Sequence, residues 1–321
     1  EVSARDVGER VHRILRRFYE GFERGAGEGW LALASERLLA IAREEMNTGR
    51  QDLFWRARAR DLMAGLASGT RAEDRRGALR RFVEREAEAD GRRPHRFEAE
   101  FQVSLDLAIA DVPGARRFVA NGRIDRVDVE EEQPPRVGGA ADLRRGEAEP
   151  GPGFVVYDYK TGKRVPDVRE ALEGRSFQLP LYLLGARALA GEGRRPIGAA
   201  YYPVGDPHHM RLRWLAEKGA VEASRGQRGL VPDLGAALER VPPAIGTALD
   251  GMAAGLFHPG DLSPDRKGCQ FCDFRRICRV DDARMKRLFD GGGPGVFRPL
   301  PLVPPVAEPA PAAAAELAAG A

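Results

Sequence analysis

The sequence has few cysteines, few lysines and no long apolar segment. No apolar run approaches the roughly 18–20 residues that a membrane-spanning helix needs, and the first six residues (EVSARD) lack the apolar stretch of a secretory signal. We therefore expect a cytoplasmic protein without a membrane partner. The Gly-x4-Gly-Lys-[Ser/Thr] motif is missing as well, which excludes a P-loop ATPase in this sequence. Because the first residue is Glu and not Met, we interpret the sequence as a fragment or a processed chain.

The charge balance restricts the function only weakly. Lys and Arg together number 51, Asp and Glu 48, and the formal net charge is +3. The sequence pI of about 8.9 is compatible with a nucleic-acid partner without requiring one. Only five of the basic residues are lysines. One of them, Lys160, ends an apolar segment that is typical of a buried strand.

The spacing of apolar residues separates helix-forming from strand-forming segments. Helices are predicted over residues 5–24, 29–46, 50–67, 71–90, 175–190 and 233–254. Strands are predicted over residues 95–109, 116–130, 154–160, 197–204 and 209–215. Helices before and after a run of strands predict a mixed α/β fold, with a central mixed sheet flanked by helices.

Changes in composition divide the chain into four parts. We expect a helical part over 1–94, an α/β core over 95–255, a cysteine-containing segment over 256–290 and a disordered Pro/Ala tail over 291–321. Within the core, residues 131–152 are rich in Glu, Pro, Gly and Arg, which predicts a mobile loop.

Asp158 and Lys160 form a charged pair at the end of the apolar strand. Because side chains alternate along a strand, both point to the same face. Charged groups at the end of a buried strand are costly unless another group compensates them. A salt bridge or emergence into solvent would suffice, so this pair alone does not identify a functional site.

Asp125 changes that interpretation. It ends the preceding strand, so it lies beside Asp158 if the two strands pair across the 131–152 loop. Two neighbouring carboxylates repel each other unless a cation lies between them, and Mg²⁺ prefers carboxylate oxygens. A lysine beside such a metal can orient an attacking water and stabilise developing negative charge. The three residues therefore predict hydrolysis of a phosphodiester.

Three cysteines, Cys269, Cys272 and Cys278, lie within ten residues. In an intracellular chain this crowding favours a metal centre over disulfides or over three reduced thiols without a ligand. Zinc needs a fourth ligand, for which His258 is available. A [4Fe-4S] cluster also needs a fourth ligand, usually Cys, and the sequence contains no other cysteine.

The chain resembles the PD-(D/E)XK nuclease superfamily, and within it the RecB/AddB-type nuclease domain. The resemblance spans about residues 7–280 and rests on the order of several short motifs. These are Gly8-x3-His12-x2-Leu15, Glu98-x2-Phe101, Gly122-Arg123-Ile124-Asp125-Arg126-Val127-Asp128, Tyr157-Asp158-Tyr159-Lys160-Thr161-Gly162, Gln178-Leu179-Pro180-Leu181-Tyr182 and Cys269-x2-Cys272-x5-Cys278. It implies a restriction-endonuclease-like core.

The resemblance implies a set of metal ligands. His12, Asp125 and Asp158 would bind Mg²⁺ or Mn²⁺, and the backbone carbonyl of Tyr159 would add an oxygen. A single histidine among arginines is usually a surface residue. The order of the motifs nevertheless favours a ligand role for His12.

The resemblance also implies catalytic residues. Lys160 would be the catalytic lysine, and Gln178 and Tyr182, four residues apart on one helix, would line the site and contact the metal-bound water or a phosphate. Glu98 either assists the site or merely flanks the strand. The three cysteines would bind a [4Fe-4S] cluster whose fourth cysteine lies before Glu1.

The function that this resemblance implies is a metal-dependent DNA exonuclease domain. It would belong to a helicase–nuclease complex in double-strand break repair, with a partner motor that supplies single-stranded DNA ends. A stand-alone or CRISPR-adaptation-type nuclease, a catalytically inactive DNA-binding scaffold and a zinc-binding interaction module are the alternatives. The arginine-rich helices over 29–90 either bind the phosphate backbone or are ordinary solvated faces.

Overall fold

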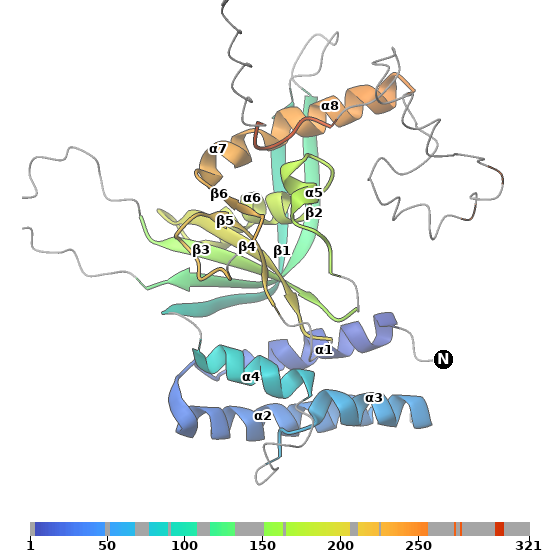
Figure 1. Ribbon diagram of the computed structural model, residues 1–321, viewed down its shortest axis with the longest axis vertical. Coiled ribbons are helices and arrows are strands. Elements are labelled where there is room, and N and C mark those ends of the chain that lie inside the picture. The colour runs from blue at the N-terminus through green and yellow to red at the C-terminus, as the bar shows by residue number, and fades with distance from the viewer. Residues whose placement is uncertain are drawn as a thin grey trace, which may run out of the picture.

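The computed structural model describes most of the chain before residue 256. The described residues are 4–48, 52–67, 77–88, 91–107, 116–131, 151–162, 165–205, 211–224, 226–255, 273, 277 and 299–304. The helices are α1 (Ala4–Tyr19), α2 (Gly27–Asn47), α3 (Leu53–Met63), α4 (Ala78–Glu88), α5 (Arg169–Leu172), α6 (Gln178–Ala190), α7 (Leu234–Glu239) and α8 (Val241–Ala253). The strands are β1 (Arg92–Leu107), β2 (Arg116–Glu130), β3 (Gly153–Lys160), β4 (Arg195–Pro203), β5 (Arg213–Glu217) and β6 (Leu230–Val231) (Figure 1).

The strands form one mixed sheet in the order β1-β2-β3-β4-β5-β6. Strands β3 and β4, and β5 and β6, pair in parallel, whereas the other neighbours are antiparallel. Strand β3 lies inside the sheet, and every residue from Gly153 to Tyr159 is buried. A strand that is covered on both faces reads as a nearly continuous apolar run, as this segment does. The predicted mixed α/β fold is confirmed.

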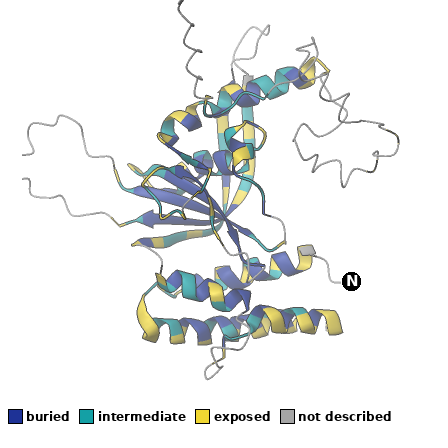
Figure 2. Ribbon diagram, viewed as in Figure 1, coloured by how far each residue is buried: buried dark blue, intermediate teal, exposed yellow. Residues whose placement is uncertain are grey.

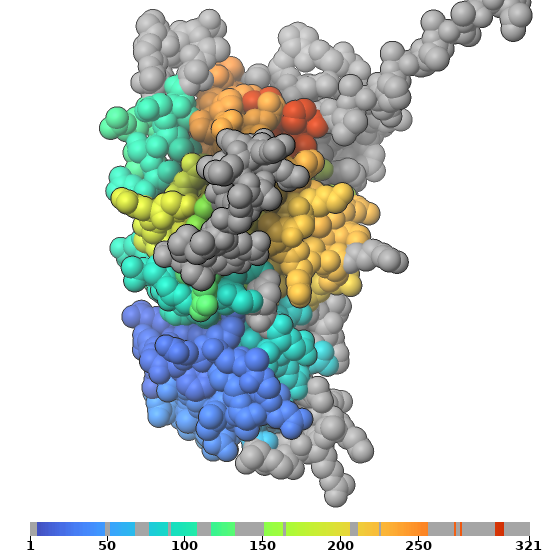
Figure 3. Space-filling view, turned by 90° about the vertical axis from the view of Figure 1, so that its left-hand side faces the viewer, coloured from blue at the N-terminus to red at the C-terminus, as the bar shows by residue number. Residues whose placement is uncertain are grey.

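Helices cover both faces of the sheet. Helices α1–α4 lie together on one side and α6 on the other (Figure 1). In α1 the apolar residues recur every three or four positions, and Val11, Ile14 and Phe18 are fully buried against the sheet and the other helices. Figure 2 shows this inward stripe along the helices, with exposed residues on their outer faces. In the space-filling view α1–α3 form one end of the molecule, and α7 and α8 lie towards the other end (Figure 3).

The structure differs from the predicted elements in several places. The helix expected over 233–254 is two helices, because Pro242 and Pro243 occupy the first turn of α8, where proline starts a helix more readily than it continues one. The short elements α5 and β6 were not predicted. No described helix is long and apolar enough to cross a membrane.

Part of the predicted disordered tail packs on the fold, which corrects that prediction for residues 299–304. Leu302 is buried, and its backbone N–H donates to the carbonyl of Leu172 over 2.8 Å. Arg240 Nε donates to the carbonyl of Pro301 over 3.0 Å. Apolar Leu302 within the proline-rich segment gives these residues a buried surface that composition alone does not reveal. Residues 132–150 of the predicted loop lie outside the described residues.

Candidate metal-binding and catalytic site

The candidate site lies where strands β1 and β2 pass beneath α1. Among the described non-glycine residues only Glu98 has a positive φ, at 46°. In the ladder between β1 and β2, Glu98 lies opposite Asp125, between the paired residues Phe97–Arg126 and Ala99–Ile124. A non-glycine residue in this region costs about 1–3 kcal/mol, and such residues cluster at functional sites. The backbone is therefore strained at Glu98, the residue whose carboxylate contacts His12 of α1.

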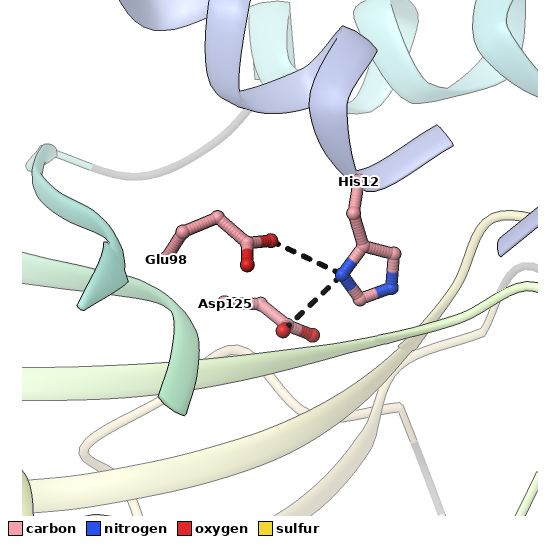
Figure 4. A group of neighbouring side chains, drawn as sticks. All are labelled: His12, Glu98 and Asp125. Carbon is pink, nitrogen blue, oxygen red and sulfur yellow. Dashed lines mark hydrogen bonds and ion pairs between the residues drawn. The ribbon is translucent and has the colours of Figure 1, made fainter. Parts of the chain in front are cut away.

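His12 reaches this position from α1. Its Nδ1 atom lies 3.2 Å from Glu98 Oε1 and 3.3 Å from Asp125 Oδ1 (Figure 4). One ligand atom from each of the three residues lies within 4.8 Å of the others, so together they could hold a metal ion. Burial lowers the pKa of His12, but hydrogen bonds to Asp125 and Glu98 outweigh this effect and raise it to about 10. Without a cation, the protonated imidazole offsets part of the negative charge of the two carboxylates.

Asp125 and Asp158 come together through the pairing of β2 and β3. The antiparallel register pairs Arg126 with Tyr157, which brings the two aspartates to adjacent strand positions. The backbone N–H of Tyr159 donates to Asp125 Oδ2 over 2.6 Å. Both aspartates are buried. Burial raises the pKa of Asp158 to about 6, and the charge of Asp125 adds to this rise, while Lys160 and His12 oppose it.

Lys160 lies on the α6 side of this pair. Its Nζ atom is 2.7 Å from Asp158 Oδ2, and it donates to Gln178 Oε1 over 3.5 Å. Gln178 Nε2 in turn donates to the hydroxyl of Tyr182 over 3.2 Å. The ammonium also lies 5.1 Å from the ring centre of Tyr201. The structure therefore connects the predicted catalytic residues of β3 and α6 in one chain of contacts.

The residues present fit a divalent cation. One imidazole nitrogen and the carboxylates of Glu98 and Asp125 come together, with buried Asp158 on the adjacent strand, and oxygen-rich sets with one imidazole suit small divalent metals. The buried Oδ2 of Asp158 is close to Lys160 but receives no well-directed hydrogen bond from any described residue. A buried carboxylate oxygen with spare acceptor capacity is the atom that a cation would complete.

The compact cluster differs from the ligand set that the sequence predicted. Glu98, whose role the sequence left open, contacts His12 directly, whereas Asp158 lies beside the cluster and pairs with Lys160. The structure gives a steric reason for the glycine in the His12 motif. A Cβ atom at Gly8 would lie 3.0 Å from Oγ1 of Thr161, the residue that follows Lys160.

Sequence analysis missed the contact of Arg123, whose Nε lies 2.8 Å from Glu98 Oε2. The position of Arg123, two residues before Asp125 in the sequence, was the feature that could have indicated this contact.

The predicted cysteine centre cannot be placed in the same way. Cys269, Cys272, Cys278 and the alternative ligand His258 lie outside the described residues.

Comparison with known proteins identifies the family. The PD-(D/E)XK nuclease superfamily model matches residues 1–279. An ATP-dependent helicase/deoxyribonuclease subunit from Desulforudis audaxviator is 28% identical to the chain over 350 residues, which cover 87% of this chain and 27% of that protein. The proteins of the same name from Moorella thermoacetica and Symbiobacterium thermophilum are 25% and 30% identical, over 88% and 60% of this chain and 27% and 19% of their own lengths. The chain thus spans about a quarter or less of these curated relatives. The family predicted from the motifs is confirmed: the chain belongs to the PD-(D/E)XK nuclease superfamily.

Proposed function

We propose that this chain is a metal-dependent DNA exonuclease module that hydrolyses phosphodiester bonds. The observation that carries the proposal is the convergence of His12, Glu98 and Asp125 beside the Asp158–Lys160 pair. These groups come from elements far apart in the sequence, and a cluster of carboxylates with a strongly shifted histidine pKa is typical of a functional site.

The metal would be held by His12, Glu98, Asp125 and Asp158, with the carbonyl of Tyr159 as a further oxygen. We propose Mg²⁺ or Mn²⁺ because three of these side chains are carboxylates. A bound divalent cation supplies Lewis acidity and makes a coordinated water a better nucleophile. The N–H of Tyr159 holds Asp125 Oδ2 and so leaves Oδ1 directed towards His12.

Lys160 is the proposed catalytic lysine. Asp158 and Gln178 hold its ammonium at the edge of the site, and it keeps 23% of its side-chain surface exposed, so a phosphate can reach it. A preorganised positive charge stabilises the negative charge that develops on the phosphoryl oxygens without reorganisation during the reaction. Gln178 and Tyr182 position this lysine and present polar atoms to the substrate.

The biological context is proposed from the relatives. Their names describe a subunit of an ATP-dependent helicase/deoxyribonuclease. We propose that this chain likewise acts in a helicase–nuclease complex, on single-stranded DNA ends supplied by a partner motor during double-strand break repair and recombination in the cytoplasm.

We further propose that Cys269, Cys272 and Cys278 bind a metal centre, with a [4Fe-4S] cluster as first choice and zinc as the alternative. Three thiolates at this spacing support the proposal. Iron, sulfide and zinc analysis of the purified protein distinguishes the two. A protein with neither metal contradicts both.

The proposed activity is tested with the Lys160→Met variant. Lys218 is an exposed lysine directly after β5, and Lys218→Met is the matched control. Degradation of labelled single- and double-stranded DNA is measured with Mg²⁺, with Mn²⁺ and with EDTA. We expect Lys160→Met to lose about 100-fold or more in rate with an unchanged circular dichroism spectrum, and the control to match the wild type.

Three results would contradict the proposal. Cleavage in EDTA, or a Lys160→Met rate within about twofold of wild type, shows that another site performs the chemistry. A wild-type chain that binds DNA but does not cleave it with either metal instead supports the inactive scaffold.

A further inference from the structure

A groove along strands β1 and β2 begins beside the candidate metal site. Its volume is about 690 Å³, and it is lined by Glu100, Phe101, Gln102, Asn121, Gly122 and Arg123. The proposed catalytic residues include none of its polar side chains.

Arg123 connects the groove to the site. Its Nε atom pairs with Glu98 Oε2 over 2.8 Å, while Glu98 uses Oε1 for His12. The Arg123 side chain is 64% exposed, whereas Glu98 is 10% exposed. No other described residue pairs with the guanidinium, so its two Nη groups remain available to a ligand. A guanidinium with two free N–H edges is suited to bidentate binding of a phosphate.

The remaining polar residues of the groove include two free amides. Gln102 and Asn121 lie directly opposite each other in the ladder, and both are exposed. No described group hydrogen-bonds to either side chain. Amides at these positions can donate to phosphate or sugar oxygens without reading the base sequence. Glu100, opposite Arg123, is the one acidic residue of the groove, and it forms no ion pair with any described residue.

Phe101 of the groove contacts the helix that carries part of the candidate site. A Cβ atom at Gly122 would lie 2.7 Å from the Phe101 ring, so glycine at this position leaves room for the ring. The Phe101 ring packs edge-on against Tyr182, with ring centres 5.6 Å apart, and Tyr182 is bonded to Gln178. A residue that lines the groove is therefore in contact with α6, which carries the proposed site residues Gln178 and Tyr182.

We propose that this groove binds the sugar–phosphate backbone of the DNA strand next to the scissile bond, with Arg123 as the residue that binds a phosphate. From Asp125 to Asn121 the strand spans about 13 Å, at about 3.3 Å per residue. The proposal rests on the proposed nuclease function, and it assigns the side of the site on which the strand is held.

The test compares a DNA strand with a small phosphodiester. Bis(4-nitrophenyl) phosphate has no neighbouring phosphate, so it reports the chemical site without the groove. We expect Arg123→Ala to raise KM for a single-stranded oligonucleotide about tenfold or more, since one charge-assisted contact is lost. The loss of kcat/KM on the small ester should be much smaller. Arg123→Lys should fall between the wild type and Arg123→Ala.

DNA binding measured without divalent cation tests the same contact independently of cleavage. In the Lys160→Met background, removal of Arg123 should reduce the slope of log affinity against log salt by about one. Arg16→Ala is the matched control, because Arg16 is similarly exposed, at 55%, and is paired with Glu20 at 3.1 Å. The control should leave both KM and the salt slope unchanged.

Two outcomes overturn the inference. Equal losses on both substrates show that Arg123 acts only by holding Glu98, and an unchanged KM and salt slope show that no phosphate is bound there. Failure of the proposed function is distinct: the wild type then cleaves neither substrate, while the binding measurement still tests Arg123.

Discussion

A buried charge network lies on the opposite side of β2 from the candidate metal site, and Glu86 of α4 is its most testable member. Arg126 is fully buried and forms two hydrogen bonds with Asp128, over 2.6 and 2.5 Å, and an ion pair with Glu86 at 3.0 Å. Arg24 pairs with Glu86 at 2.5 Å and with Asp128 at 3.2 Å. Two guanidinium groups thus face two carboxylates. Arg126 also donates to the hydroxyl of Tyr159 over 3.4 Å, which places the network directly behind the site.

The Glu86→Gln variant keeps the size of the side chain but removes one of the two negative charges. Breaking a buried ion pair by removal of one partner costs about 3–5 kcal/mol. A second route gives a similar value: burial raises the pKa of Glu86, but Arg126 and Arg24 outweigh this and lower it from 4.5 to about 2. A pKa difference of this size corresponds to about 3 kcal/mol of folding free energy at neutral pH.

The sign of the pH dependence follows from the lowered pKa. The stabilisation is fully present above the pKa of the unfolded state, near 4.5, and is lost as the pH falls through the pKa of the folded state, near 2. The difference in unfolding free energy between wild type and Glu86→Gln should therefore be about 3 kcal/mol at pH 7 and about 1 kcal/mol at pH 3.

Urea denaturation at both pH values measures this difference, and the m-value should stay constant. Glu84→Gln is the control on the same helix, because Glu84 pairs with Arg80 in a partly exposed i,i+4 pair, and it should cost less than about 1 kcal/mol. A loss for Glu86→Gln below about 1 kcal/mol at pH 7, or an equal loss at both pH values, refutes the reasoning.

Two further predictions concern the site. Glu98→Gln should weaken Mn²⁺ binding about tenfold or more in titration calorimetry, because it replaces a charged oxygen donor, and unchanged affinity would remove Glu98 from the metal site. Gly205→Ala should lower nuclease activity and should lower stability by about 1–3 kcal/mol, because its Cβ would lie 1.9 Å from the carbonyl of Thr161 and displace the strand end that carries the proposed catalytic lysine. Gly29→Ala, where no atom lies within 4 Å, should be neutral or stabilising, and equal effects at both glycines would contradict the steric argument.

Local features of the chain were predictable from the sequence. Residues 116–130 were predicted as a strand and are β2, and the apolar run before Lys160 is the buried strand β3. The alternation of side chains along a strand was sufficient to place Asp158 and Lys160 together, since the two residues are adjacent on one face. Such features depend on the period of apolar residues and on short spacings, which are properties of the chain itself.

The composition of the site depends on contacts between distant segments. His12 and Glu98 are 86 residues apart, and they meet because the apolar stripe of α1 packs across the sheet. The left-handed backbone of Glu98 is held by the surrounding strands and has no signature in a single sequence. Likewise, Arg126 and Asp128 read as ordinary strand charges until the helices bury them.

The sequence by itself therefore determined the order of the main elements, the charged pair on β3 and the family of the chain. Only the tertiary structure decided that Glu98 joins His12 and Asp125, that Arg123 faces a groove and that residues 299–304 pack on the core. The reason is that each of these depends on which surfaces are buried against each other, and burial is a property of the folded chain as a whole.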